Sequence, residues 1–186
     1  MLEAGLELFG ERGYHATSIA EIGLWAGIAK SVLYHYFGSK AGLYEEIATA
    51  QTRDLLAAVA EAVPADPDAP RLRAGVDAYL SFLAGRRAAW RLFLRDPPLE
   101  PALVALHDRL ARETEESLSH VLTQRAKRGR AQPHAGLVAT AIRTFTAWWF
   151  DHPEVPREHV VDAIMDVAAA AGRHIERAGP AAASGH

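Results

Sequence analysis

The stretch TSIAEIGLWAGIAKSVLYHYFGSK, residues 17–40, contains two short helix-forming segments joined at a glycine. Thr17 or Ser18 can cap the first segment, and Glu21 is placed to complete a capping box with Ser18. Gly27 lies where the chain must turn, because glycine adopts a positive φ without the steric cost that other residues meet. Two short helices crossing at such a turn indicate a helix-turn-helix, which presents its second helix to the major groove of DNA.

The second segment, expected at about residues 29–37, divides into two faces when its residues are placed 100° apart. The apolar residues predicted to form the core of the motif are Ile19, Ile22, Ile28, Leu33 and Phe37. The outward arc carries an ammonium, a hydroxyl, a phenol and an imidazole that can reach phosphate oxygens or base edges, on Lys30, Ser31, Tyr34 and His35. Val32 lies at the edge of this arc, where it can contact a thymine methyl group.

Tyr34 and Tyr36 could instead be core aromatic residues, which is the commoner role of such side chains on a short helix. Because Leu33 and Phe37 already supply core contacts, we favour outward positions for Tyr34 and His35. Lys40 lies at the start of the next helix, where the free N–H groups and the helix dipole also favour phosphate.

Helical periodicity continues along the chain, and strand signals are nearly absent. The sequence therefore predicts an all-α protein of about nine helices. The expected helices span residues 2–12, 18–26, 29–37, 39–63, 71–85, 87–95, 99–127, 134–151 and 157–177.

The composition restricts the functions that are open to the chain. It has 186 residues, a net charge of −3 and no cysteine, which excludes disulfides and thiolate metal sites. Residues 12–40 carry a net charge of +2, so any nucleic-acid surface is local and small. There is no signal-like N-terminus and no apolar run long enough for a membrane span, so we expect a cytoplasmic protein without a membrane partner.

Three phrases of the N-terminal part appear in a specific order: F-x-E-x-G-Y-x-x-T-S, A-G-I and L-Y-x-Y-F-x-S-K-x-x-L. Over about 46 residues they resemble the DNA-binding domain of the TetR/AcrR family of transcriptional regulators. The resemblance implies phosphate contacts from Thr17, Tyr36 and Lys40. The full set of candidate DNA-binding residues is Thr17, Ser18, Lys30, Ser31, Val32, Tyr34, His35, Tyr36 and Lys40.

The chain departs from the family pattern at a few positions. Ala29 stands where Ser or Thr is common, so the second helix lacks an N-cap side chain that contributes about 1 kcal/mol. Gly23, Leu24 and Trp25 replace polar residues, and Trp25 is expected to pack on the first or fourth helix. Family members usually have several residues before the first helix, which leaves open whether residues precede Met1 in the natural chain.

The resemblance implies a DNA-binding domain at residues 1–47 and a ligand-binding and dimerisation domain at 48–178. The small and polar residues of the C-terminal end predict a disordered tail at 179–186. The predicted dimer interface uses the last two helices and an apolar stripe, for which an intramolecular core is an equally good interpretation: Val160, Val161, Ile164, Met165, Val167 and Ala168. Pairing about a twofold axis suits a pseudo-palindromic operator. The aromatic candidates for a ligand pocket, each of which is more often plain core, are Tyr79, Phe82, Trp90, Phe93, Phe145, Trp148 and Trp149.

The expected function is that of a homodimeric repressor released from its operator by a small apolar or aromatic effector. The effector would need to prefer the other state of the dimer by about 2–4 kcal/mol. Activation is also open, because no residue fixes the sign of regulation. We find no catalytic motif and no helical His pair for a metal, so neither an enzyme nor a cofactor is expected. The two alternatives are an architectural DNA protein and a helical enzyme or carrier with a vestigial helix-turn-helix.

Overall fold

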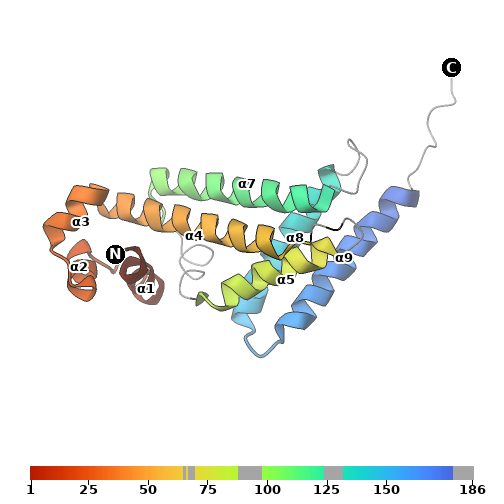
Figure 1. The fold of residues 1–186 in the computed structure, drawn as a ribbon, viewed down its shortest axis with the longest axis horizontal. Helices are drawn as coiled ribbons and strands as arrows, with labels where there is room; N and C mark the ends of the chain where they lie inside the picture. Colours follow the sequence, from red (N-terminus) through yellow and green to blue (C-terminus); the bar gives the residue numbers. More distant parts are fainter. Residues whose placement is uncertain (65, 67–69, 88–97, 124–131, 178–186) are drawn as a thin grey trace, which may run out of the picture. The chain divides into compact units, whose positions relative to one another are not determined.

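The computed structural model consists of helices, with no strand among the residues that it describes: 1–64, 66, 70–87, 98–123 and 132–177. Figure 1 shows them as α1 (Leu2–Arg12), α2 (Ile19–Ala26), α3 (Lys30–Phe37), α4 (Lys40–Ala62), α5 (Arg71–Ala84), α7 (Pro101–Thr123), α8 (Gln132–Asp151) and α9 (Arg157–Arg177). The all-α prediction is confirmed, and these helices lie where the sequence predicts them. Most of the helix expected at 87–95, residues 124–127 and the tail lie outside the described residues. None of the described helices is long and apolar enough to cross a membrane.

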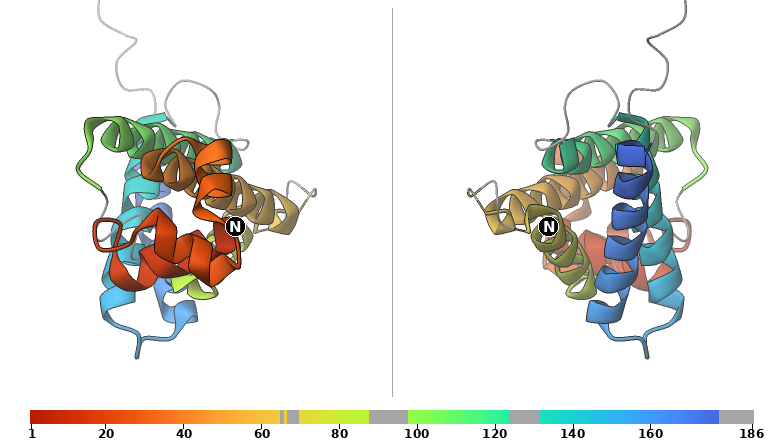
Figure 2. Two further views of the ribbon diagram at one scale, coloured as in Figure 1. Left: turned by 90° about the vertical axis from the view of Figure 1, so that its left-hand side faces the viewer. Right: turned by 90° about the vertical axis from the view of Figure 1, so that its right-hand side faces the viewer.

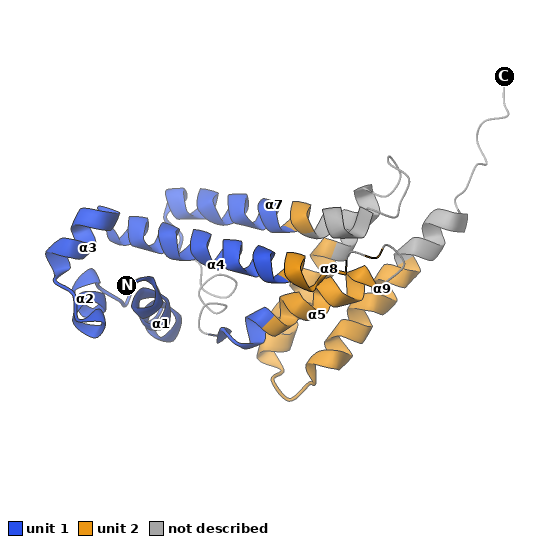
Figure 3. Cartoon of the chain, viewed as in Figure 1, with its two compact units in different colours: residues 1–58, 82–114 blue, residues 59–81, 115–186 orange. Residues whose placement is uncertain are grey.

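The chain forms two compact units, which Figure 3 distinguishes by colour. Unit 1 contains residues 1–58 and 82–114, and unit 2 contains residues 59–81 and 115–186. Unit 1 therefore extends beyond the DNA-binding domain expected at residues 1–47, because it includes more of α4 and the first part of α7. The functional boundary at residue 47 stays a prediction.

The helix-turn-helix in unit 1 is built by local interactions. The Glu21 N–H donates to Ser18 Oγ at 3.2 Å, and the Ser18 N–H donates to Glu21 Oε2 at 2.8 Å, so the expected capping box begins α2. Gly27 ends α2 with φ 67° and ψ 30°, the left-handed conformation that favours glycine. The Ile28 N–H then donates to the Gly23 carbonyl at 2.8 Å, and α3 begins after Ala29 without a side-chain cap.

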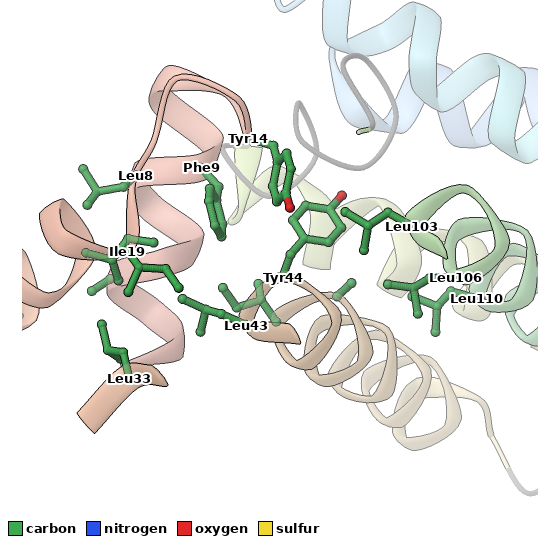
Figure 4. Close-up of a cluster of buried hydrophobic side chains, with 14 residues drawn as sticks. Leu8, Phe9, Tyr14, Ile19, Leu33, Leu43, Tyr44, Leu103, Leu106 and Leu110 are labelled. Atoms are coloured by element: carbon green, nitrogen blue, oxygen red, sulfur yellow. The ribbon is translucent and has the colours of Figure 1, made fainter. Parts of the chain in front are cut away.

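One apolar core holds α1–α4 and the first part of α7 together within unit 1 (Figure 4). Ile22 and Leu33 are fully buried, so the inward face expected for α2 and α3 is confirmed. From α7, Leu103, Leu106 and Leu110 join this core, since their spacing places them on one helical face. Its other buried members are Ala4, Leu8, Phe9, Tyr14, Ile19, Leu43, Tyr44, Ile47 and Ala48.

Unit 2 contains α8 and α9, which run side by side and are joined by a short turn (Figure 2). The Trp149 Nε1–H donates to the Val155 carbonyl at 2.8 Å, which fixes this turn. Exposed ion pairs within the unit join α5 to α9: Arg73 Nη2 lies 2.7 Å from Asp162 Oδ1, and Arg157 Nε lies 3.1 Å from Asp77 Oδ1. Exposed pairs of this kind add little stability each.

Candidate DNA-binding surface

Helix α3 presents a face of mixed chemistry to solvent. Tyr36 is 67% exposed, Tyr34 44% and Val32 38%, and the other polar residues on the same helix are also exposed: Lys30, Ser31 and His35. Leu33 is fully buried on the opposite side. Every residue predicted to reach the groove from this helix is therefore accessible in the structure.

Two side-chain pairs restrict the exposed groups of α3. The Lys30 ammonium lies 5.4 Å from the centre of the Tyr34 ring, within the range of a cation–π interaction. The His35 and Tyr36 rings meet edge to face at 5.5 Å. The helix contains no acidic residue, so none of its own side chains opposes the approach of a phosphate.

The side chain of Thr17 is buried, and its hydroxyl forms hydrogen bonds within the protein. Its hydroxyl lies 3.1 Å from the Leu8 carbonyl and 2.9 Å from the Gly13 carbonyl, both of which can accept its proton. These bonds hold the end of α1 against the turn that leads to α2. The buried hydroxyl argues against the phosphate contact that we expected from this side chain.

Lys40 holds the same turn from the start of α4. Its ammonium donates to the Tyr14 carbonyl at 2.9 Å and to the Thr17 carbonyl at 3.0 Å, and it lies 4.3 Å from the centre of the Tyr14 ring. An ammonium has three N–H donors, so one remains for a phosphate. The structure thus gives Lys40 a role in positioning the turn in addition to the DNA contact that stays predicted.

Replacing Lys40 by Met is expected to lower the free energy of unfolding by about 1–2 kcal/mol, because two carbonyls lose a charged donor at a partly buried site. Urea denaturation followed by circular dichroism measures the change. Lys30→Met is the matched control, since Lys30 is exposed and its loss should change stability by less than about 0.5 kcal/mol. Equal stability of the two variants would contradict the positioning role.

Ser18 and Trp25 lie at opposite ends of α2. Ser18 is exposed, but its hydroxyl accepts the Glu21 N–H in the capping box. The Trp25 indole N–H donates to Glu7 Oε2 at 3.0 Å, so this side chain lies beside α1, as one of the two expected positions requires. Trp25 nevertheless remains 65% exposed.

Four residues that the sequence did not single out also belong to this part of the protein. Tyr44 OH lies 2.7 Å from His107 Nε2, and Tyr14 OH donates to Glu100 Oε2 at 3.3 Å. The tyrosines lie next to the motif, but their partners are 63 and 86 residues further along the chain. No local pattern indicates contacts at that separation.

The aromatic candidates for a ligand site are divided between the two units. Tyr79 and Trp149 are buried in unit 2, Phe145 is half-buried there, and Trp148 is exposed and stacks on His152 at 4.3 Å. Burial raises the pKa of Tyr79, which keeps its hydroxyl protonated. Phe82 belongs to unit 1, and Trp90 and Phe93 lie outside the described residues.

The stripe expected at the dimer interface is only partly accessible. Val160, Val161 and Ile164 are buried within the single chain, where they form part of the unit 2 core. Met165 and Ala168 are half-buried, and Val167 is exposed. The described residues contain no group of three or more His, Asp or Glu that could hold a metal ion.

A helix-turn-helix whose second helix exposes lysine, serine, tyrosine and histidine defines the class of DNA-binding transcriptional regulators. Comparison with known proteins agrees with this class. The family model for "Bacterial regulatory proteins, tetR family" matches residues 1–47. The transcriptional regulator BetI of Vibrio campbellii is 31% identical over 152 residues, which cover 76% of this chain and 72% of BetI. The chain belongs to the tetR family.

Two other proteins show how far the similarity extends along the chain. The transcriptional activator FasR of Mycolicibacterium smegmatis is 29% identical over 175 residues, covering 90% of this chain and 79% of FasR. The structure of the regulator FadR from Bacillus subtilis, solved with stearoyl-CoA, has a TM-score of 0.77 at 16% identity and covers 91% of this chain and 95% of FadR. The FadR comparison shows a shared fold over nearly the whole chain.

Proposed function

We propose that the protein is a ligand-responsive repressor that binds a pseudo-palindromic operator as a homodimer in the cytoplasm. The exposed face of α3 is the observation that carries the proposal, because it offers donors and one apolar contact on a helix-turn-helix. Ser31 and His35 lie one turn apart on this face and would meet base edges in the major groove. Val32 would contact a thymine methyl group, and Tyr36 and the remaining Lys40 donor would contact phosphates.

Homodimer formation is supported by the small size of this surface. One eight-residue helix reads only a few base pairs, so two copies about a twofold axis are needed for a specific site. Exposed apolar side chains on α8 and α9 are suited to the contact, with Trp148 45% and Val167 36% exposed. We propose that α8 and α9 of two copies pair through such residues rather than through the buried Val160 and Ile164.

The effector is proposed to be apolar or aromatic, with a site lined by residues of unit 2. Buried Tyr79 and half-buried Phe145 provide aromatic surface there, and Thr146 adds a buried hydroxyl. FadR, which shares the fold, was solved with stearoyl-CoA, a ligand with a long apolar chain. FasR is named an activator, so the sign of regulation needs its own test.

Selection from a pool of random-sequence duplexes tests the DNA-binding proposal. The full chain is expected to enrich a sequence with two inverted half-sites and to bind it at least about a thousandfold more tightly than random duplex at moderate salt. Fluorescence anisotropy measures both affinities. Enrichment of no sequence, or equal affinity for the selected and random duplexes, would refute the proposal.

Whether the protein represses or activates is tested by placing the selected duplex upstream of a reporter gene and measuring its transcription. Repression requires that the protein lowers transcription in vitro with purified polymerase. Increased transcription would identify an activator and leave the DNA-binding assignment intact. A screen of apolar compounds by thermal shift would then identify ligands, since binding to the folded state raises its Tm.

A further inference from the structure

We infer that Glu100, which immediately precedes α7, and His107 of α7 are positioning residues for DNA binding, which act by holding Tyr14 and Tyr44. We call these four residues the α7 latch. The inference rests on the proposed DNA-binding function and adds to it a second segment, far from the helix-turn-helix in sequence. All four residues belong to unit 1.

Two hydrogen bonds from buried tyrosines form the latch. Tyr44 is fully buried and Tyr14 is 3% exposed. Burial raises the pKa of Tyr44 and, together with the Glu100 carboxylate, raises the pKa of Tyr14 to about 12, so both remain phenols that donate. Burial lowers the pKa of His107, so its ring is a neutral imidazole whose Nε2 can accept the Tyr44 proton at 2.7 Å.

The rings of the latch pack as one cluster. Tyr14 and Tyr44 meet edge to face at 5.2 Å, and the Phe9 ring lies 5.5 Å from Tyr14 and 5.9 Å from Tyr44. Figure 4 shows the Tyr14 and Tyr44 side chains next to each other, with Leu103 beside Tyr44. The His107 ring lies 5.7 Å from that of Tyr44. A shift of α7 therefore cannot leave Tyr14 and Tyr44 in place, because such a core is close-packed.

Tyr14 connects this cluster to the DNA-binding surface. Its carbonyl and its ring hold the Lys40 ammonium, and the same ammonium binds the Thr17 carbonyl. Thr17 immediately precedes the Ser18 cap of α2, and α2 packs directly on α3. The latch thus fixes the turn from which α2, and through it α3, takes its position.

Packing alone does not explain the latch. The three buried leucines of α7 already attach this helix to the core, but the hydrophobic effect that drives their burial has no preferred direction. Hydrogen bonds restrict both distance and direction, so Tyr44–His107 and Tyr14–Glu100 define where α7 lies against α4 and the turn. Specific base contacts need that precision, because a displaced recognition helix loses its hydrogen bonds to base edges.

The test compares operator affinity with stability in variants of the full chain. Tyr44→Phe and His107→Phe each remove one side of the Tyr44–His107 hydrogen bond and keep the other, so each should lower both the urea midpoint and the affinity for the selected duplex. The double variant Tyr44→Phe/His107→Phe removes both sides of this bond together, so its urea midpoint should rise above that of either single variant. The affinity of the double variant for the selected duplex should stay about tenfold below that of the wild type when it is measured at 15 °C, a temperature at which the variant is folded.

Rescue and control variants complete the test. His107→Gln places an amide oxygen near the position of Nε2 and should restore affinity to within about twofold of the wild type. Tyr14→Phe tests the Tyr14–Glu100 hydrogen bond, because it removes only the Tyr14 hydroxyl. The matched control removes an exposed ion pair between α4 and α7, Arg109 Nη2 to Glu45 Oε1 at 3.2 Å. Glu45→Gln removes the charge of this pair and should leave DNA affinity unchanged.

Recovery of both affinity and stability in the double variant would overturn the inference, because the bond would then serve folding only. Unchanged affinity in Tyr14→Phe and Tyr44→Phe would do the same. A wild-type chain that selects no duplex would instead refute the proposed function, and the inference with it. The two failures are therefore distinguished by the wild-type measurement.

Discussion

A glutamate in place of Ser31 is expected to lower the affinity of the protein for its operator by at least about a hundredfold, because a carboxylate beside DNA phosphates costs several kcal/mol. Ser31 is exposed and lies on the outward arc of α3, one turn from His35. In the proposed dimer the change introduces one negative charge at each half-site. Both charges would enter the major groove on α3, a helix that contains no acidic residue in the wild type.

The same substitution is expected to preserve the fold or to stabilise it slightly. Ser31 is the second residue of α3, and Ala29 provides no side-chain cap there. A carboxylate in the first turn of a helix interacts favourably with the free N–H groups and the helix dipole, by about 0.3–1 kcal/mol. Loss of DNA binding in Ser31→Glu would thus come from the surface charge and not from unfolding.

Anisotropy with the selected duplex and urea denaturation measure these two effects separately. Ser31→Gln introduces a side chain of nearly the same shape as glutamate but without its charge, so this variant should lose much less affinity for the duplex than Ser31→Glu. Ala57→Glu adds the same charge at an exposed position of α4 and controls for net charge. An affinity of Ser31→Glu within about threefold of that of Ala57→Glu would show that α3 does not enter the groove.

Helix positions could be predicted from the sequence because their signals are local. Ser18 and Glu21 are three residues apart, and their capping box forms without help from the rest of the chain. Gly27 similarly ends α2 through its own backbone conformation. The outward face of α3 was also predictable, because the buried position of Leu33 determines by helical geometry where Tyr34 and His35 point.

The side-chain partners could not be predicted in the same way. The resemblance implied phosphate contacts for Thr17 and Lys40, but both side chains bind backbone carbonyls of their own chain. Tyr14 and Tyr44 find Glu100 and His107 only through the tertiary packing of α7, which no periodicity encodes. The apolar stripe of α9 was ambiguous for a related reason, because a pattern shows which face is apolar and not whether the same chain covers it.

Gly42 occupies a position where the end of α3 meets the start of α4. A Cβ on this residue would lie 2.1 Å from the Phe37 carbonyl oxygen and 3.2 Å from its carbon. Both are backbone atoms of the last residue of α3, so they cannot rotate away as the end of a side chain can. The third residue of α4 must therefore be glycine for α3 to lie where it does.

Gly42→Ala is accordingly expected to destabilise the protein by about 3 kcal/mol or more, even though alanine favours a helix over glycine by about 1 kcal/mol. Any fraction that folds would carry a displaced α3 and bind the selected duplex at least about tenfold more weakly. Urea denaturation and anisotropy measure the two effects. Gly5→Ala is the matched control, because the one atom within 3 Å of its Cβ would be Ile47 Cδ1 at 2.6 Å, the far end of a side chain, and its stability should change by less than about 1 kcal/mol. Equal effects at the two glycines would show that the end of α3 can move without cost, and the position of the recognition helix would then not depend on this contact.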